Sequence, residues 1–307
     1  MLPNEKITVR DRLGFMGLGY LGSRIARRLI AAGFPMTVYD LDHTKALELE
    51  ALGAEVARNS GQLAGSVEVV LSCLPDEQAV KTAYLGTGNV LGSAKPGTRI
   101  IELSTISPEA SRQLHSAAKQ FEVSALDVAV SGSTSSAEAG AVTLFGGGNR
   151  EVFDASEAIF SAIARQWFYM GPSGSGVAMK LVVNTLLGVG MQAVAEAVAL
   201  GSRLELPRDL LLDTLAKTAV VAPAHLGKLA TAKKRDYFPQ FPVRLMRKDF
   251  GLILNAASQL RLSMPTTDAA AAINSAEAES GIEEDFSAVI RRMEQEAGVE
   301  NALPPAA

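Results

Sequence analysis

Hydrophobic positions follow two different patterns along the 307-residue chain, and the pattern changes near residue 173. From residue 12 to about 170, short β-rich runs alternate with amphipathic segments such as 21–32 and 108–120. The runs that predict strands are residues 12–17, 35–40, 54–59, 66–75, 97–104 and 122–130. This alternation indicates an α/β domain in which helices cover a parallel sheet.

The second half of the chain has the pattern of an all-α domain. Residues 176–204 contain no helix breaker except isolated glycines, and an Ala- and Leu-rich helical pattern continues to about residue 298. A helix over residues 176–204 would be about 43 Å long at 1.5 Å per residue, enough to leave one domain and continue into the next. We therefore predict domains at 1–173 and 174–307, joined by a long interdomain helix. The tail 301–307 is expected to be disordered.

The stretch GFMGLGYLGSRIARRLIAAG, residues 14–33, contains the glycine spacing G-x-G-x-x-G. This spacing is weak evidence alone, but here a strand precedes it, a helix follows it, and Asp40 ends the next strand. Such glycines let the backbone approach a pyrophosphate at the helix N-terminus, and the acid accepts hydrogen bonds from a ribose. The sequence thus predicts a Rossmann dinucleotide-binding domain. Its expected cofactor residues are Gly17, Leu18, Gly19, Tyr20, Leu21, Gly22 and Asp40.

Asp40 also bears on which dinucleotide binds. A carboxylate there would repel the 2′-phosphate of NADP, and Leu41 offers no guanidinium to hold one, so the pattern favours NAD. His43 and Lys45 follow closely, which leaves NADP open. A doubly wound domain that binds another nucleotide, or none, is the structural alternative.

Composition restricts the function classes. With 48% hydrophobic and 20% charged residues and a net charge of −4, the chain is globular and has no basic footprint for nucleic acid or an anionic membrane. The single cysteine, Cys73, lies in an apolar run and is expected to be buried, in a protein of a reducing compartment. The three histidines lie far apart, so no metal site is expected.

The chain also carries no pattern of a membrane protein or a signal peptide. The charge-free apolar stretch 181–195 is too short to span a bilayer, and the first ten residues contain proline and charges. We therefore expect a soluble, cytoplasmic protein.

Candidate chemistry follows the predicted strands and continues in the long helix. Residues 71–76 and 102–110 each end a strand at the carboxyl edge of the sheet, and the turn Ser131–Gly132–Ser133 could hold a carboxylate. Lys180 and Asn184 lie four residues apart, and therefore on one helix face, in an otherwise apolar stretch. Desolvation lowers a lysine pKa and suits the amine to proton transfer. The alternatives are plain polar loops and a lysine that reaches the domain surface beside a core asparagine.

With these motifs in order, the chain resembles the β-hydroxyacid dehydrogenase family, which includes 3-hydroxyisobutyrate dehydrogenases and glyoxylate/succinic-semialdehyde and tartronate-semialdehyde reductases. The resemblance covers nearly the whole chain. The matching motifs are GFMGLGYLGSRIA, LSCLPD, STISP, DVAVSGSTSSAEAGAVTLFGGG, GSGVAMKLVVN and FPVRLMRKDFGLIL.

The resemblance implies roles for individual residues. Lys180 matches the proton-transfer lysine, and Leu74, Pro75, Thr105 and Lys248 match residues that contact the cofactor. The substrate residues it implies are Ser131, Gly132, Ser133, Asn184, Phe241 and Asp249. The predicted function is hydride transfer between a nicotinamide cofactor and a small 3-hydroxy acid or its semialdehyde.

Some positions depart from the family pattern, and two other functions stay open. Thr185 stands where Asn is usual, and residues 128–132 read VAVSG where APVSG is usual, which puts the substrate in doubt more than the reaction. An imine reductase shares the two-domain plan but usually carries Asp or Tyr in place of Lys180. A non-catalytic dinucleotide-binding module would have lost that lysine. Apolar surface in the helical half and the resemblance together predict a homodimer or homotetramer formed through that domain.

Overall fold

The computed structural model describes residues 4–279 and 283–299. The predicted tail, 301–307, lies outside the described residues. The chain divides into two compact units, Met1–Lys180 and Leu181–Ala307.

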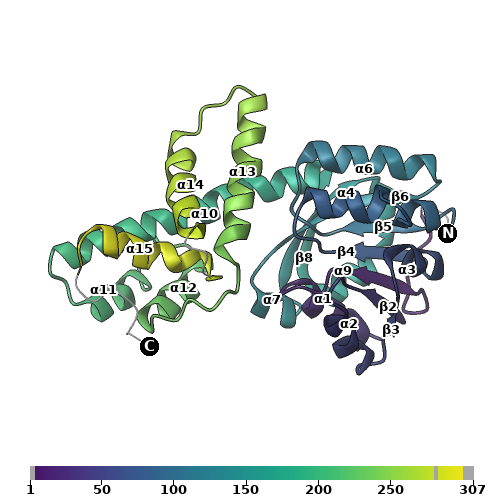
Figure 1. Cartoon of the computed structure of the whole chain (residues 1–307), viewed down its shortest axis with the longest axis horizontal. Coiled ribbons are helices and arrows are strands. Elements are labelled where there is room, and N and C mark those ends of the chain that lie inside the picture. The colour runs from purple at the N-terminus through teal and green to yellow at the C-terminus, as the bar shows by residue number, and fades with distance from the viewer. Residues whose placement is uncertain (1–3, 280–282, 300–307) are drawn as a thin grey trace. The chain divides into compact units, whose positions relative to one another are not determined.

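An eight-stranded sheet forms the centre of the first unit, with strand order β3-β2-β1-β4-β5-β6-β7-β8. The strands are β1 (Leu13–Met16), β2 (Met36–Tyr39), β3 (Glu55–Val56), β4 (Val69–Ser72), β5 (Arg99–Glu102), β6 (Ser124–Ser131), β7 (Val142–Gly148) and β8 (Ala164–Gly171). The helices of this unit are α1 (Gly22–Ala31), α2 (His43–Glu50), α3 (Ser60–Ser66), α4 (Glu77–Leu85), α5 (Val90–Ser93), α6 (Pro108–Gln120), α7 (Thr134–Glu138), α8 (Arg150–Ala155) and α9 (Glu157–Ile163). Figure 1 shows this α/β arrangement.

The predicted parallel sheet is confirmed for β1 to β6, but one edge of the sheet departs from it. Strands β1 to β6 pair in parallel, but β7 pairs antiparallel with β6, and β8 is parallel to β7. The only helix between β6 and β7 is α7, whose five residues are too few for a parallel crossover. Neither β7 nor β8 was among the predicted strands; β7 ends in three glycines, and half of the residues of β8 are exposed.

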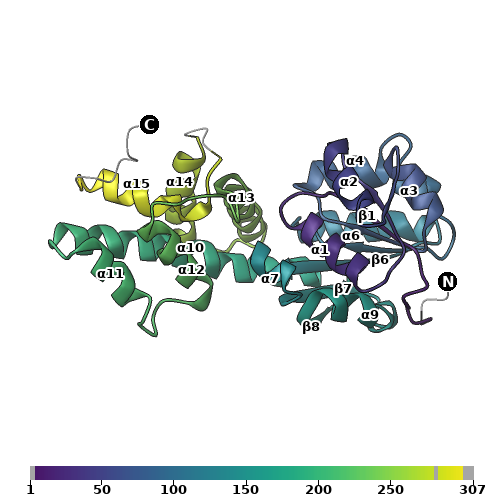
Figure 2. The same ribbon diagram turned by 90° about the horizontal axis from the view of Figure 1, so that it is seen from below.

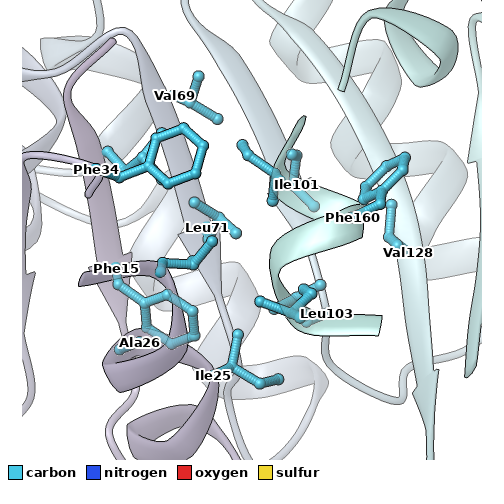
Figure 3. Close-up of a cluster of buried hydrophobic side chains, with 14 of the residues drawn as sticks. Phe15, Ile25, Ala26, Phe34, Val69, Leu71, Ile101, Leu103, Val128 and Phe160 are labelled. Carbon is cyan, nitrogen blue, oxygen red and sulfur yellow. The ribbon is translucent and has the colours of Figure 1, made fainter. Parts of the chain in front are cut away.

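Alternating side chains along the central strands supply the two cores of this unit. Leu71 and Ile101 point to one face, where α1, α2, α8 and α9 pack, while Val70 and Ile100 point to the other, beneath α3 to α6. Figure 3 shows Phe15, Leu71, Ile101 and Phe160 meeting in the first core. Strands buried on both faces produce the nearly continuous apolar runs seen in the sequence.

The second unit is helical, as expected. Its elements are α10 (Ser175–Arg203), which begins in the first unit, α11 (Arg208–Leu215), α12 (Pro223–Lys233), α13 (Val243–Gln259), α14 (Pro265–Ala278), the 3₁₀ turn η1 (Phe286–Ala288) and α15 (Val289–Glu296). In Figure 2, α11 and α14 lie on opposite sides of α10. Met246, Phe250 and Ile253 recur on one face of α13 and are buried in this core.

The helix α10 has 29 residues and extends well beyond the charge-free apolar stretch 181–195. Among the described helices it alone is long and apolar enough to cross a membrane by length and composition. Its Met191, Val194, Ala195 and Val198 are buried with side chains of α13 and α15. Packing in the core of the second unit therefore accounts for the apolar character of this part of α10.

Candidate active site

The last residues of β2, β1, β4 and β5 form one row at the carboxyl edge of the sheet, in line with Asp127 in the middle of the longer strand β6. The register pairs Met16 with Tyr39 and Ser72, Ser72 with Glu102, and Glu102 with Asp127. The strand order reverses between β1 and β4, and open α/β sheets bind ligands at such a point. The predicted loops therefore begin side by side.

Two of the three motif glycines are required by the packing of the loop. Gly17 has φ +86°, and a Cβ there would lie 2.3 Å from the carbonyl oxygen of Cys73; a Cβ at Gly22 would lie 1.9 Å from the carbonyl oxygen of Gly17. A Cβ at Gly19 would meet nothing within 4 Å, so internal packing does not explain this glycine. This open space is compatible with the close approach of a ligand to the backbone.

The N-terminus of α1 differs from those of its neighbours. Asp42, Asn59 and Asp76 cap α2, α3 and α4, whereas no described side chain caps α1, and its first turn contains no acid. In that turn the Ser23 N–H donates to the Gly19 carbonyl at 3.1 Å and the Arg24 N–H to the Leu21 carbonyl at 3.2 Å, so an anion would be favoured by the helix dipole and by amides of the glycine loop that precede these two. This arrangement fits a dinucleotide pyrophosphate.

Asp40 lies directly against the glycine loop. Its Oδ2 accepts a hydrogen bond from the Leu18 N–H at 2.6 Å, and its Oδ1 accepts one from the Asp42 N–H at 2.8 Å. The Lys45 Nζ is 3.9 Å from Oδ1, and the side chain of Leu41 is exposed. The carboxylate is therefore held beside the loop by two backbone donors.

The predicted cofactor segments after β4 and β5 are tied together. The Leu74 N–H donates to the Ser104 hydroxyl at 2.7 Å, and the Ser107 N–H donates to Glu77 Oε1 at 2.5 Å. Leu74 and Pro75 therefore have a fixed relation to the segment that contains Thr105.

Beneath these segments lies a buried network that the sequence did not indicate. Glu102 accepts hydrogen bonds from the Ser104 N–H at 2.8 Å and from the Ser72 hydroxyl, which is also 2.5 Å from the Tyr84 hydroxyl. Burial raises the pKa of Glu102, although the hydrogen bonds from Ser104 and Ser72 oppose this effect. Burial, and then the nearby Glu102, raise the pKa of Tyr84 well above its ordinary value. The one sign of this network in the sequence is Glu102 itself, an acidic residue at the end of an apolar strand.

The serine turn follows β6. Ser131 is the last residue of that strand, and Gly132 has φ +152°, where a Cβ would lie 3.0 Å from Val142. The Ser133 hydroxyl accepts a hydrogen bond from the Ser136 N–H at 3.1 Å and so caps α7. Ser133 therefore has a structural contact in addition to its predicted role at the substrate.

A second buried acid holds the start of α10. Asp127 Oδ1 accepts from the Gly174 N–H at 2.8 Å and Oδ2 accepts from the Val177 N–H at 3.0 Å. The His115 Nε2 is 3.4 Å from Oδ1, and burial lowers the pKa of this histidine. We predicted no role for Asp127, although it interrupts an apolar strand.

Lys180 lies one turn after this anchored start and is 9% exposed. Gly176 lets α10 begin against the sheet, since a Cβ there would lie 2.4 Å from the carbonyl oxygen of Phe145. Cys73, expected to be buried, is only partly so.

The predicted residues of the second unit form their own cluster. The Asn184 Nδ2 donates to Asp249 Oδ2 at 2.5 Å, and the Lys248 Nζ is 3.0 Å from Asp249 Oδ1. Asn184 and Asp249 are both buried. Within the described part of the chain, Asn184 Oδ1 has no hydrogen-bond partner, as expected of an acceptor that serves a ligand. Phe241 lies just before α13 and packs against Phe286.

Metal ligation receives no support from this arrangement. Over residues 4–279 and 283–299 there is no group of three or more His, Cys, Asp or Glu side chains that could hold an ion.

Comparison with known proteins gives the same assignment over both parts of the chain. Residues 12–171 match the family model described as the NAD binding domain of 6-phosphogluconate dehydrogenase. Residues 174–293 match a second family model, which is described as "NAD-binding of NADP-dependent 3-hydroxyisobutyrate dehydrogenase". The chain is 35% identical over 286 residues to the NAD-dependent L-serine dehydrogenase of Pseudomonas aeruginosa, covering 91% of this chain and 96% of the relative.

The chain belongs to the β-hydroxyacid dehydrogenase family. It is also 31% identical over 290 residues to 2-(hydroxymethyl)glutarate dehydrogenase of Eubacterium barkeri, covering 94% of this chain and 96% of that protein. The crystal structure of 3-hydroxyisobutyrate dehydrogenase from Salmonella typhimurium matches with a TM-score of 0.85 at 27% identity, covering 92% of this chain and 99% of that chain. This β-hydroxyacid dehydrogenase has an NAD(P)-binding domain, which agrees with the glycine loop and Asp40.

Proposed function

We propose that the protein is an oxidoreductase that transfers a hydride between a nicotinamide cofactor and a small 3-hydroxy acid or its semialdehyde. The observation that carries this proposal is the position of Lys180. This lysine is buried and lies one turn beyond the start of α10, which is bound by the Asp127 carboxylate. Asn184 follows it at four residues on α10 and has a buried side-chain carbonyl oxygen that accepts no hydrogen bond from any described group.

Lys180 is the proton-transfer residue in this proposal. During oxidation its neutral amine takes the proton of the substrate hydroxyl while the carbon that bears this hydroxyl loses a hydride. During reduction the ammonium returns the proton to the developing alkoxide. The low exposure of this lysine supports the role, because few water molecules compete there for the proton that moves. The nicotinamide ring, when bound, supplies or accepts the hydride.

The remaining predicted residues hold the two ligands. Ser131, Gly132 and Ser133 would orient the substrate carboxylate, while Asn184, Phe241 and Asp249 would contact the rest of the substrate. Leu74, Pro75, Thr105 and Lys248 would contact the cofactor. Asp40 beside the exposed Leu41 supports NAD as the preferred dinucleotide, because a 2′-phosphate would meet a carboxylate and no guanidinium.

The names of the relatives narrow the substrate class. L-Serine, 2-(hydroxymethyl)glutarate and 3-hydroxyisobutyrate each have a hydroxymethyl group on the carbon that bears the carboxylate. We infer that the substrate has this same arrangement and that only the third substituent differs. Relatives named as dehydrogenases favour this function over an imine reductase or a non-catalytic module.

The decisive experiment compares the wild type with Lys180→Ala. The NADH absorbance change would be followed with these hydroxy acids, with glyoxylate and succinic semialdehyde, and with cyclic imines. We expect kcat of Lys180→Ala to fall by about a thousandfold, within the usual range for proton-transfer groups, with NAD affinity retained. Lys233→Ala, which removes a lysine partly exposed beside Asp213, is the matched control. Near-normal turnover by Lys180→Ala would contradict the assignment.

We further propose a cytoplasmic protein that forms a homodimer or homotetramer through the second unit. The exposed Val182, Leu186 and Leu200 recur along one face of α10 and support such an interface. Light scattering after size exclusion would measure the mass, and a monomer would contradict this proposal.

A further inference from the structure

A buried acid in the second unit fixes the segment that contains Phe241. This segment, residues 237–242, is the second part of the connection between α12 and α13, both green in Figure 1. Asp285 Oδ2 accepts hydrogen bonds from the N–H groups of Gln240 at 3.1 Å and Phe241 at 3.0 Å. One carboxylate oxygen therefore binds two successive amides of the segment, although Asp285 is more than 40 residues away in the sequence.

Lys228 supplies the counter-charge. Its Nζ on α12 is 2.7 Å from the same Asp285 Oδ2 and 5.3 Å from the centre of the Phe286 ring. The Lys228 and Asp285 side chains are only 9% and 3% exposed. Desolvation of both charges is costly, and an apolar pair of similar volume is often no less stable, so stability alone is a poor explanation for this pair.

Further contacts join Phe241 to Asp285 and its neighbours. The Phe286 N–H donates to the Phe241 carbonyl at 3.0 Å, and the two rings meet edge to face with centres 5.6 Å apart. Asp285 Oδ1 accepts from the Ser287 hydroxyl at 2.7 Å and from its N–H at 3.1 Å. The N–H, the carbonyl and the ring of Phe241 are thus each fixed by residue 285 or 286.

Only a carboxylate meets all these requirements at once. Its two oxygens accept from Lys228, from two adjacent backbone amides and from Ser287, whereas an amide side chain has a single acceptor atom and would present donors to donors. Loss of the acceptor would leave the Phe241 N–H without this partner while the segment remained covalently attached to α13.

We propose that Asp285, with Lys228 as its counter-ion, is a positioning residue that fixes Phe241 and thereby determines which third substituent of the hydroxy acid the enzyme accepts. This inference rests on the proposed function, because the role of Phe241 at the substrate belongs to that proposal. Asp285 touches no reacting atom; it acts through Phe241.

The test is a double-mutant cycle of Asp285→Asn and Phe241→Ala, measured as kcat and KM for substrates that differ in the third substituent. Asp285→Asn should raise KM for the best substrate by about tenfold, with kcat and the KM for NAD changed little, and should reduce the preference among substituents. In the Phe241→Ala background, Asp285→Asn should have no further effect on KM. An unchanged KM, or effects that add, would overturn the proposal.

Two further variants separate positioning from stability. Glu294 is as buried as Asp285 and forms an ion pair with Arg208 in the same unit. Glu294→Gln removes the charge from this pair, so it should lower the denaturation midpoint without changing KM. Lys228→Met keeps the Asp285 acceptors but removes the counter-charge. It should raise KM in the same direction by a smaller factor, again only while Phe241 is present, so it tests the proposal even if Asp285→Asn fails to fold.

Hydrogen exchange at the Phe241 amide distinguishes failure of this inference from failure of the proposed function. A wild type inactive on every substrate would refute the proposed function. Faster exchange of the Phe241 amide in Asp285→Asn or Lys228→Met would support the fixation of this residue, and unchanged exchange in both would refute it.

Discussion

The Oδ2 atom of Asp127 accepts a hydrogen bond from the Val177 N–H at 3.0 Å, so a side chain of β6 holds the first turn of α10. Gly174 donates to the other oxygen at 2.8 Å. Lys180 follows within one turn, and the orientation of its helix therefore depends on this buried carboxylate.

We predict that Asp127→Ala lowers stability by about 2–3 kcal/mol, because two buried amides lose their charged acceptor. The same variant should lower kcat more than it raises the KM for NAD, since the lysine-bearing turn loses its anchor. Denaturant unfolding and steady-state kinetics would measure the two effects. Asp154→Asn, which changes an exposed pair with Arg150, is the control and should change neither.

Cofactor preference should respond to the residues that follow β2. We expect the double variant Asp40→Ser with Leu41→Arg to raise the ratio of kcat/KM for NADPH to that for NADH by at least about tenfold, roughly 1.4 kcal/mol. The change removes a carboxylate and adds a guanidinium where a 2′-phosphate would lie. Leu52→Arg adds the same charge at another exposed leucine and should leave the ratio unchanged. An unaltered ratio in the double variant would be evidence against this position for the adenine ribose.

The buried Glu102 predicts a pH dependence of stability. Because burial raises its pKa above the ordinary value of 4.5, the folded protein keeps this proton at pH values where the unfolded chain has released it. Wild-type stability should therefore fall as the pH rises from about 4.5 through the folded pKa.

Glu102→Gln does not titrate, so its stability relative to the wild type should increase over this same pH window. Denaturant unfolding between pH 4.5 and 8 would measure the difference. Glu157→Gln, at an exposed position, should show no such trend. A difference between Glu102→Gln and the wild type that is constant with pH would contradict the prediction.

Two helical glycines should respond oppositely to alanine. Gly251→Ala on α13 meets nothing within 4 Å and should stabilise the protein by about 0.5–1 kcal/mol, since alanine is the better helix former. Gly176→Ala would place a Cβ 2.4 Å from the Phe145 carbonyl oxygen and should destabilise by about 1–3 kcal/mol or more. Thermal denaturation midpoints would test both, and tolerance of alanine at Gly176 would disprove close packing there.

The elements that hydrophobic periodicity marks clearly could be predicted from the sequence. The six predicted strands and the long helix over 176–204 correspond to β1 to β6 and to α10. The strands β7 and β8 could not be predicted in this way, because a glycine-rich run and an exposed edge strand lack the buried alternation on which such predictions depend.

The sequence by itself determined the glycine loop, Asp40 and the buried Lys180 as candidates, since each depends on a local spacing or on a charge in an apolar stretch. Only the tertiary structure decided what Asp127, Glu102 and Asp285 do. Their partners come from strands, helices and loops tens of residues away, and a buried carboxylate acquires its role from the donors that the fold brings to it.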